Sequence, residues 1–351
     1  YSWRVPDRIS SNVKVRIYDS ADYTVYKTSE VFTIRGDFII NSPKSSYEWI
    51  VYDATTHPIT YPITWNTVGT ISIVRIRYWD TTLATPDKWV TIPGCDSYAN
   101  SGSYDWPVPD KISYGAQAFD VKIRIIDPNN PTVVYKDSPG FKIRARIQTT
   151  DPITNTAWIV TKQCPITWTT TGTVPLVRID YLSALTGGWV TIVNNEPNDG
   201  AYDWTVPNDI TQDFSTRVMV LDTRDTSIIA DPYSQLSPGF KIRGEFTVRQ
   251  PDSGLEQWDV GSVYPITWTQ LGAIPNVKLE YTQNGLWTDT LTIIGAVSNT
   301  GTYNWTIPDK ITPATSTVKV RISDTRDSTV YDDSDNGFKI RGKFNIGYPN
   351  I

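Results

Sequence analysis

The sequence predicts an all-β chain in which one β-sandwich domain is repeated in tandem. A block that reads GFKIR closes each copy, at residues 140–144, 239–243 and 337–341, and a looser copy, FTIRG, occupies residues 32–36. The blocks between these markers alternate apolar and polar residues, as strands with one buried and one solvated face do. Turn residues separate the blocks about every 8–12 positions, which is typical of an immunoglobulin-like sandwich of about seven strands.

The strand blocks follow one another in the same order in every copy. In the first whole copy they are PITW at 62–65, VRIRY at 74–78, WVTI at 89–92, a Tyr-x-Trp-x-x-Pro block at 104–109 and VKIRI at 121–125. The tryptophans of the first and fourth of these motifs lie on the apolar side of their strands each time. We therefore expect the cores to be built on Trp65, Trp106, Trp168, Trp204, Trp268 and Trp305.

The closing block also sets the domain boundaries. Whole units are predicted at 37–145, 146–244 and 245–342, with the C-terminal half of a unit at 1–36 and the start of another at 343–351. No Gly/Ser linker separates them, so we expect a stiff rod with an axial advance of roughly 35–45 Å per unit. Neither part-unit can close its own sandwich, and its open edges would favour aggregation. This predicts a window of a longer polypeptide.

Composition excludes several classes of protein. The net charge of −5 argues against a general nucleic-acid binder. No apolar run approaches the length of a membrane span. The two cysteines, Cys95 and Cys164, are at non-equivalent positions of different units, which predicts free thiols rather than a repeated disulfide. His57, the single histidine, lies in an insert of the first unit, so no histidine-based triad or metal cluster recurs, and we predict a protein that is not an enzyme.

Aspartate-rich loops precede the closing block and have two interpretations. Asp caps tight turns through its own side chain, and this explanation suits every copy. The alternative is calcium, which takes six to eight oxygen ligands from carboxylates and carbonyls. The candidate ligands are Asp222, Asp225, Asp324 and Asp327, and no other cofactor is expected.

The polar faces of three strands are basic. In a seven-strand sandwich the third, sixth and seventh strands share a sheet, so their Lys and Arg side chains would form a stripe on one face. One interpretation is a solvated face balanced by neighbouring Asp, and the other is a docking face for an acidic polymer, a glycan or a neighbouring chain. The candidate contacts in the first unit are Arg75, Arg77, Lys122, Arg124, Lys142 and Arg144.

The ordered set of motifs resembles the Kre/Knh family of yeast cell-wall synthesis proteins, whose unit is also called the Ser-Thr-rich GPI-anchored membrane domain. The segments 102–109, 200–207 and 301–308, which read GxYxWxxP, carry most of the resemblance. Relatives of this unit also occur in tandem in very long bacterial surface proteins, which the array resembles more than it does the single fungal domain. The resemblance implies an extracellular, cell-surface location, and it supplies no catalytic residues to carry over.

Together these observations predict a non-catalytic structural segment of a long extracellular repeat protein that forms a surface fibre, stalk or filament. Its partners would be the neighbouring repeats of the same chain, or copies of itself in a fibre. The alternative is an adhesin-like array that binds glycan or an acidic surface polymer through the basic sheet face. Neither interpretation includes nucleic acid or a membrane span.

Overall fold

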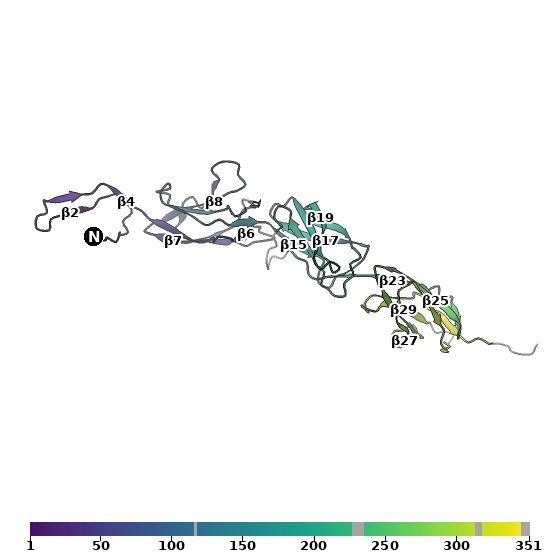
Figure 1. The fold of residues 1–351 in the computed structure, drawn as a ribbon. Coiled ribbons are helices and arrows are strands. Elements are labelled where there is room, and N and C mark those ends of the chain that lie inside the picture. The colour runs from purple at the N-terminus through teal and green to yellow at the C-terminus, as the bar shows by residue number, and fades with distance from the viewer. Residues whose placement is uncertain (116–117, 227–234, 313–317, 345–351) are drawn as a thin grey trace, which may run out of the picture.

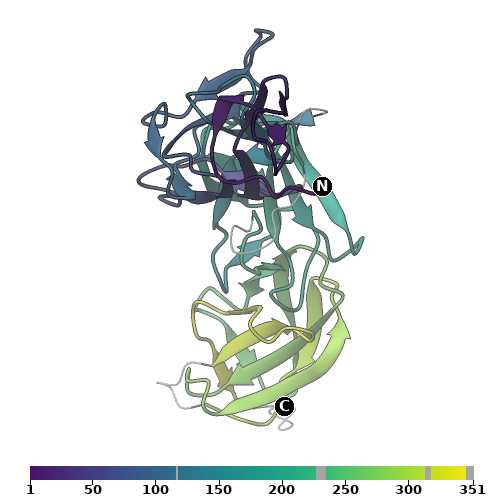
Figure 2. The same ribbon diagram turned by 90° about the vertical axis from the view of Figure 1, so that its left-hand side faces the viewer.

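The computed structural model describes residues 1–115, 118–226, 235–312 and 318–344. These residues form strands and turns, and the predicted all-β fold is confirmed. Three sandwiches follow the partial unit end to end (Figure 1). Figure 2 views the same array from its N-terminal side. Within the described ranges, no helix has the length and apolar character needed to cross a membrane.

The first whole unit is a two-sheet sandwich. Strands β11, β7 and β5 form one sheet, and β10, β8, β12 and β13 form the other, with β9 also paired to β8. A short parallel pair, β6 with β14, closes the side of the sandwich. The strands are β5 (Asp37–Ser42), β6 (Glu48–Ile50), β7 (Tyr61–Val68), β8 (Ile73–Trp79), β9 (Trp89–Thr91), β10 (Tyr98–Ala99), β11 (Ser103–Trp106), β12 (Ile123–Ile126), β13 (Tyr135–Asp137) and β14 (Lys142–Arg144).

The second and third units have the same three-stranded sheet and the same parallel closing pairs, β16–β22 and β24–β31, and in each of them one long strand, β19 or β27, pairs where β9 and β10 do in the first unit. The second unit contains β15 (Arg146–Asp151), β16 (Ala157–Ile159), β17 (Gln163–Thr171), β18 (Leu176–Leu182), β19 (Trp189–Pro197), β20 (Ala201–Thr205), β21 (Val218–Asp222) and β22 (Lys241–Arg243). The third contains β23 (Glu245–Gln250), β24 (Gln257–Asp259), β25 (Val263–Leu271), β26 (Asn276–Thr282), β27 (Thr290–Ser298), β28 (Thr302–Thr306), β29 (Lys319–Asp324), β30 (Tyr331–Asp333) and β31 (Lys339–Arg341). The partial unit has β1 (Ser10–Val13) on β4 (Phe32–Ile34) and β2 (Arg16–Tyr18) on β3 (Tyr26–Thr28).

Aromatic side chains fill the space between the sheets. The six tryptophans predicted as core are 2–6 % exposed. In the second unit the indole of Trp204 meets Trp158 edge-to-face at 5.9 Å between ring centroids, and it meets Phe240 at 6.4 Å. The same triad recurs as Trp106 with Trp49 and Phe141, and as Trp305 with Trp258 and Phe338.

A buried hydrogen bond ties the PITW tryptophan to a loop asparagine in each unit. Trp65 Nε1 donates to Asn100 Oδ1 at 2.7 Å, and Asn100 Nδ2 donates to the carbonyl of Ile71 at 2.7 Å. A buried indole N–H needs an acceptor, so this asparagine belongs to the core. Sequence reasoning missed it, although an Asn-x-Gly triplet recurs at the same place. The equivalent bonds join Trp168 to Asn198 and Trp268 to Asn299.

The closing strand, β14, does not lie in the sheet of the third and sixth strands, where the prediction of a basic stripe placed it. The strand next to β12 is β13, which the sequence analysis did not count, whereas β14 pairs in parallel with β6. Within the described residues a single bridge, between Val121 and Phe141, joins the closing block to the sixth strand. The polar side chains of β14, Lys142 and Arg144, therefore lie buried at the end of the unit rather than on an open sheet face.

The glycine of the closing block is required by a close backbone approach. A Cβ built on Gly239 would lie 2.1 Å from the carbonyl oxygen of Phe214, and backbone cannot yield as a side-chain tip can. We expect Gly239→Ala to destabilise the second unit by about 1–3 kcal/mol, the usual range for overpacking. Urea unfolding followed by unit-resolved hydrogen exchange measures it. Gly188→Ala, which meets nothing within 4 Å, is the control in the same unit and should unfold like the parent chain.

Candidate functional site at the unit junctions

Each unit passes into the next with almost no free chain. Only Ala145 separates β14 from β15, and only Gly244 separates β22 from β23. One residue spans at most about 3.5 Å, so neighbouring units are held in contact. The junctions are therefore the places where a function shared by the whole array can be sought.

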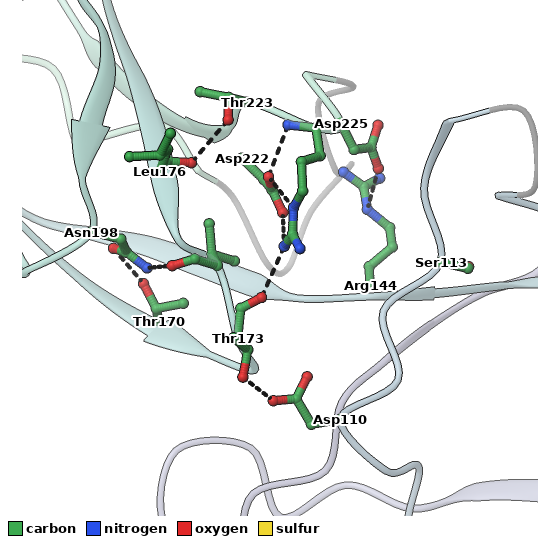
Figure 3. Close-up of polar contacts among 12 residues, drawn as sticks. Asp110, Ser113, Arg144, Thr170, Thr173, Leu176, Asn198, Asp222, Thr223 and Asp225 are labelled. Carbon is green, nitrogen blue, oxygen red and sulfur yellow. Dashed lines mark hydrogen bonds and ion pairs between the residues drawn. The ribbon is translucent and has the colours of Figure 1, made fainter. Parts of the chain in front are cut away.

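A side chain of one unit caps a loop of the next at each of the three junctions that the structure describes. The donors follow the glycine after PITW, and the acceptors follow the proline of the Tyr-x-Trp block. Figure 3 shows the second of these bonds, from the Thr173 hydroxyl to Asp110. The equivalent bonds are Thr70 Oγ1 to Asp7 Oδ2 (2.6 Å), Thr70 N to Asp7 Oδ1 (3.0 Å), Thr173 Oγ1 to Asp110 Oδ2 (2.6 Å) and Ala273 N to Asn208 Oδ1 (2.9 Å).

The glycine next to this hydrogen-bonded cap packs against two apolar side chains of the preceding unit. Gly172 has φ of +87°, a left-handed conformation, and a Cβ there would lie 3.2 Å from both Ile112 and Val51. Gly272 has the same φ and would approach Val160 at 2.8 Å and Ile210 at 2.9 Å. The glycine is needed for its conformation and for close contact between units.

Buried ion pairs cross two of the junctions. Lys142 Nζ lies 2.5 Å from Asp225 Oδ2, and Arg144 Nε lies 3.5 Å from the same oxygen. Figure 3 shows Arg144 directed at Asp225 from the preceding unit. At the next junction Lys241 pairs with Asp327. The three cations are only 4–5 % exposed, so their charges depend on these carboxylates and, for Arg144, on Glu48 at 2.6 Å.

The charged partners change together along the array. The partial unit has Thr33 where the later units have Lys142 and Lys241, and the first unit has Asn130 where its successors have Asp225 and Asp327. At that junction a hydrogen bond to the backbone joins the units, from Arg35 Nη1 to the carbonyl of Val133 at 3.2 Å. The same contact recurs from Arg243 Nη1 to the carbonyl of Thr329 at 3.4 Å.

The four aspartates considered as calcium ligands are engaged by cations of the chain. Asp222 and Asp324 pair with the arginine two residues on, Arg224 and Arg326, at 2.7 and 3.0 Å. Asp225 and Asp327 cross the junctions as described. The pair with Asp222 holds the guanidinium of Arg224 over the ring of Tyr114 in the preceding unit, 4.8 Å from its centroid. In the part of the chain that the structure describes, no group of three potential ligands gathers around one point.

The basic face is largely neutralised by neighbouring acids. Arg75 pairs with Asp96 at 2.6 Å, and Arg77 lies 3.8 Å from Asp87. Arg124 makes a bidentate ion pair with Asp137, with N–O distances of 2.5 and 2.7 Å. Its guanidinium also stacks between Trp89 and Tyr135, and Asp137 raises its pKa further. Lys122 is exposed on this face, whereas Lys142 and Arg144 are buried at the junction.

The insert of the first unit adds contacts at the junction between the first and second units. The Oγ1 atoms of Thr56 and Thr171 lie 2.7 Å apart, and Arg146 Nη1 donates to the carbonyl of Thr56 at 3.0 Å. His57, next in the chain, is 2 % exposed. Its pKa is lowered from 6.5 because burial disfavours the imidazolium, and the positive charge of Arg146 adds to the effect.

Acid is therefore expected to weaken the first unit through His57. The unfolded chain takes up this proton near pH 6.5, whereas the folded chain resists it. The stabilising contribution of neutral His57 is thus complete above about pH 6.5 and is lost as the pH falls below it. Thermal unfolding of the parent chain and of His57→Gln at about pH 7.5 and pH 5 measures this. The parent should lose more stability than the variant on acidification, and an equal loss would contradict the expectation.

The junction contacts define a tandem array of sandwiches in which each unit positions the next. No family model and no curated protein sequence matches this chain, so the resemblance to the Kre/Knh family is not confirmed. Solved structures with similar arrangements include a tetra-tandem repeat from the extending region of a large adhesion protein, at 16 % identity and a TM-score of 0.32, covering 91 % of this chain and 79 % of that one. Another comprises the three N-terminal domains of the bacteriophage RB49 highly immunogenic outer capsid protein, at 11 % identity and a TM-score of 0.30, covering 88 % of this chain and 100 % of that one.

Proposed function

We propose that this chain is a non-catalytic structural segment of a long extracellular repeat protein, in which the units form a stiff surface fibre, stalk or filament. The observation that supports this most is the recurrence of this cap at the three junctions that lie within the described residues. Repeat arrays gain reach by adding units whose stability depends on the contacts between neighbours. The units are connected by one residue, and hydrogen bonds, an apolar contact and buried ion pairs hold them together. Such a junction is suited to fix the orientation of each unit relative to the next.

Small-angle scattering of the chain tests the rod. We expect a rod-like profile whose maximum dimension grows by roughly 35–45 Å when a unit is added, since strands rise about 3.3 Å per residue. A chain with about ten Gly/Ser residues inserted after Ala145 is the matched control and should scatter as jointed beads. Identical profiles for the two chains would contradict the proposal. Surface labelling of intact cells that produce the protein tests the location separately.

A depression on the first unit favours a second candidate, an adhesin-like array that binds glycan. It encloses about 370 Å³, at the lower end for small-molecule sites, between β8, β9 and β12. The half-buried indoles of Trp79 and Trp89 pack edge-to-face there at 5.3 Å between centroids. Indole surfaces suit the C–H face of a sugar ring, and because Arg124 covers one face of Trp89, a sugar would pack on the remaining indole surface. The exposed Asp120 and Lys122 on the rim supply hydrogen-bonding groups.

Titration of the chain with surface glycans, followed by tryptophan fluorescence, tests this second candidate. Trp79→Leu, which copies Leu182 of the second unit, should abolish binding without unfolding the first unit. An acidic polymer would bind more weakly as salt rises, and Lys122→Glu would remove it. Neither substitution should change the scattering profile, so the two proposed functions are separable.

A further inference from the structure

The end of the third unit has the two apolar side chains with which earlier units contact the glycine of the next unit. Val260 and Ile311 are the equivalents of Val51 and Ile112, which receive Gly172. Ile112 is 7 % exposed, whereas Ile311 is 60 % exposed. The equivalent isoleucine is thus buried at the junction between the first and second units and exposed to solvent on the end face of the third.

The polar groups of the face also match. Asp309 is exposed at the position from which Asp110 caps Thr173. Lys339 is partly exposed, although Lys142 and Lys241 are both buried against an aspartate of the following unit. Arg341 turns back onto its own unit, with Nε 2.6 Å from Asp259 and Nη1 2.7 Å from Gln257.

Phe344 follows the closing block of the third unit. It is 97 % exposed, although Phe38 and Phe246, its equivalents in the opening strands of the first and third units, are 0 and 3 % exposed. Those two rings are core residues of the sandwich that their strand opens. At the internal junctions the equivalent end face is covered by the next sandwich of the repeat, which therefore has the chemistry that fits this face.

We propose that this end face binds another unit of the same repeat, and that Lys339 selects a unit with an aspartate at the position of Asp225 and Asp327. A buried ammonium requires an anion. Where the first junction has threonine in place of the lysine, the facing loop has asparagine in place of the aspartate. The inference rests on the proposed structural function and adds a pairing rule to it.

The test appends a second copy of residues 245–342 after Gly342 of the chain. The copy supplies its own Asp327 to Lys339. The matched control carries Asp327→Asn in the appended copy only, which keeps the acceptor for the turn but removes the charge. A third chain combines that change with Lys339→Thr and so reproduces the Thr33 and Asn130 pair. Hydrogen exchange of residues 309–312 and 339–341 reports docking, and sedimentation velocity reports association.

We expect protection of these two segments to rise about tenfold on appending the copy, to fall in the single variant and to recover in the double variant. Equal exchange in the three appended chains would overturn the pairing rule. Protection of Ile311 through dimers of the parent chain would show that a second copy covers the face instead. If the chain scatters as a rod while the appended copy moves freely, this inference fails and the structural function stands.

Discussion

Replacing Trp204 by alanine is expected to destabilise the second unit by about 3–5 kcal/mol, a large share of the stability of one such domain. The indole is 5 % exposed and lies between Trp158, Phe240 and Tyr181, whose ring centroid is 5.0 Å away. Its removal leaves a cavity where the two sheets meet, and the rigid strands on either side can close it only in part.

The measurement should resolve single units, because unfolding of a multidomain chain is not two-state. Hydrogen exchange of β17 and β20 in rising urea does so. Trp189→Ala is the matched control, because that indole is in the same unit and 39 % exposed. The control should cost less than half as much. Similar losses in the two variants would show that Trp204 is not the centre of the core.

Replacing Asp225 by alanine is expected to cost about 3 kcal/mol at the first-to-second junction. Lys142 and Arg144 are nearly inaccessible to water, and the substitution removes the carboxylate that both of them contact, while Glu48 still pairs with Arg144. Breaking one side of a buried pair costs more than the pair itself contributes, because the remaining charge is unsolvated. We expect β14 to exchange faster and the two units to lose their fixed angle in scattering.

The residue pair at the first junction suggests a second variant that should restore the stability lost in Asp225→Ala. Lys142→Thr combined with Asp225→Asn copies the neutral residues Thr33 and Asn130, and it should recover most of the lost stability. Asp203→Ala removes an exposed carboxylate of the same unit and should have little effect. A double variant as unstable as Asp225→Ala would show that charge pairing is not what joins these units.

The fold could be predicted because its signals are local. Alternation along a strand decides which side chains face inward, and the tryptophans of PITW and Tyr-x-Trp keep their parity in each copy. The candidate site could not be predicted in this way. The Asp110 cap and its Thr173 donor are 63 residues apart, and they meet only because one sandwich ends against the next.

The basic residues show the same division. Alternation correctly places Arg75, Arg77 and Arg124 on the polar side of their strands, and acids beside them in the sheet neutralise them. It says nothing about what lies beyond the end of a unit. Lys142 and Arg144 are polar by parity and yet buried, because β14 pairs with β6 and the following unit covers them.

The sequence by itself thus determined the all-β class, the repeat and the apolar face of each strand, since these follow from the pleat and from turn residues nearby in the chain. Only the tertiary structure decided the partners of the loop aspartates. A carboxylate in a loop can cap a turn, bind a cation or pair with a lysine, and the choice depends on which group of another unit lies within reach. For Asp225 that group is Lys142, across the junction.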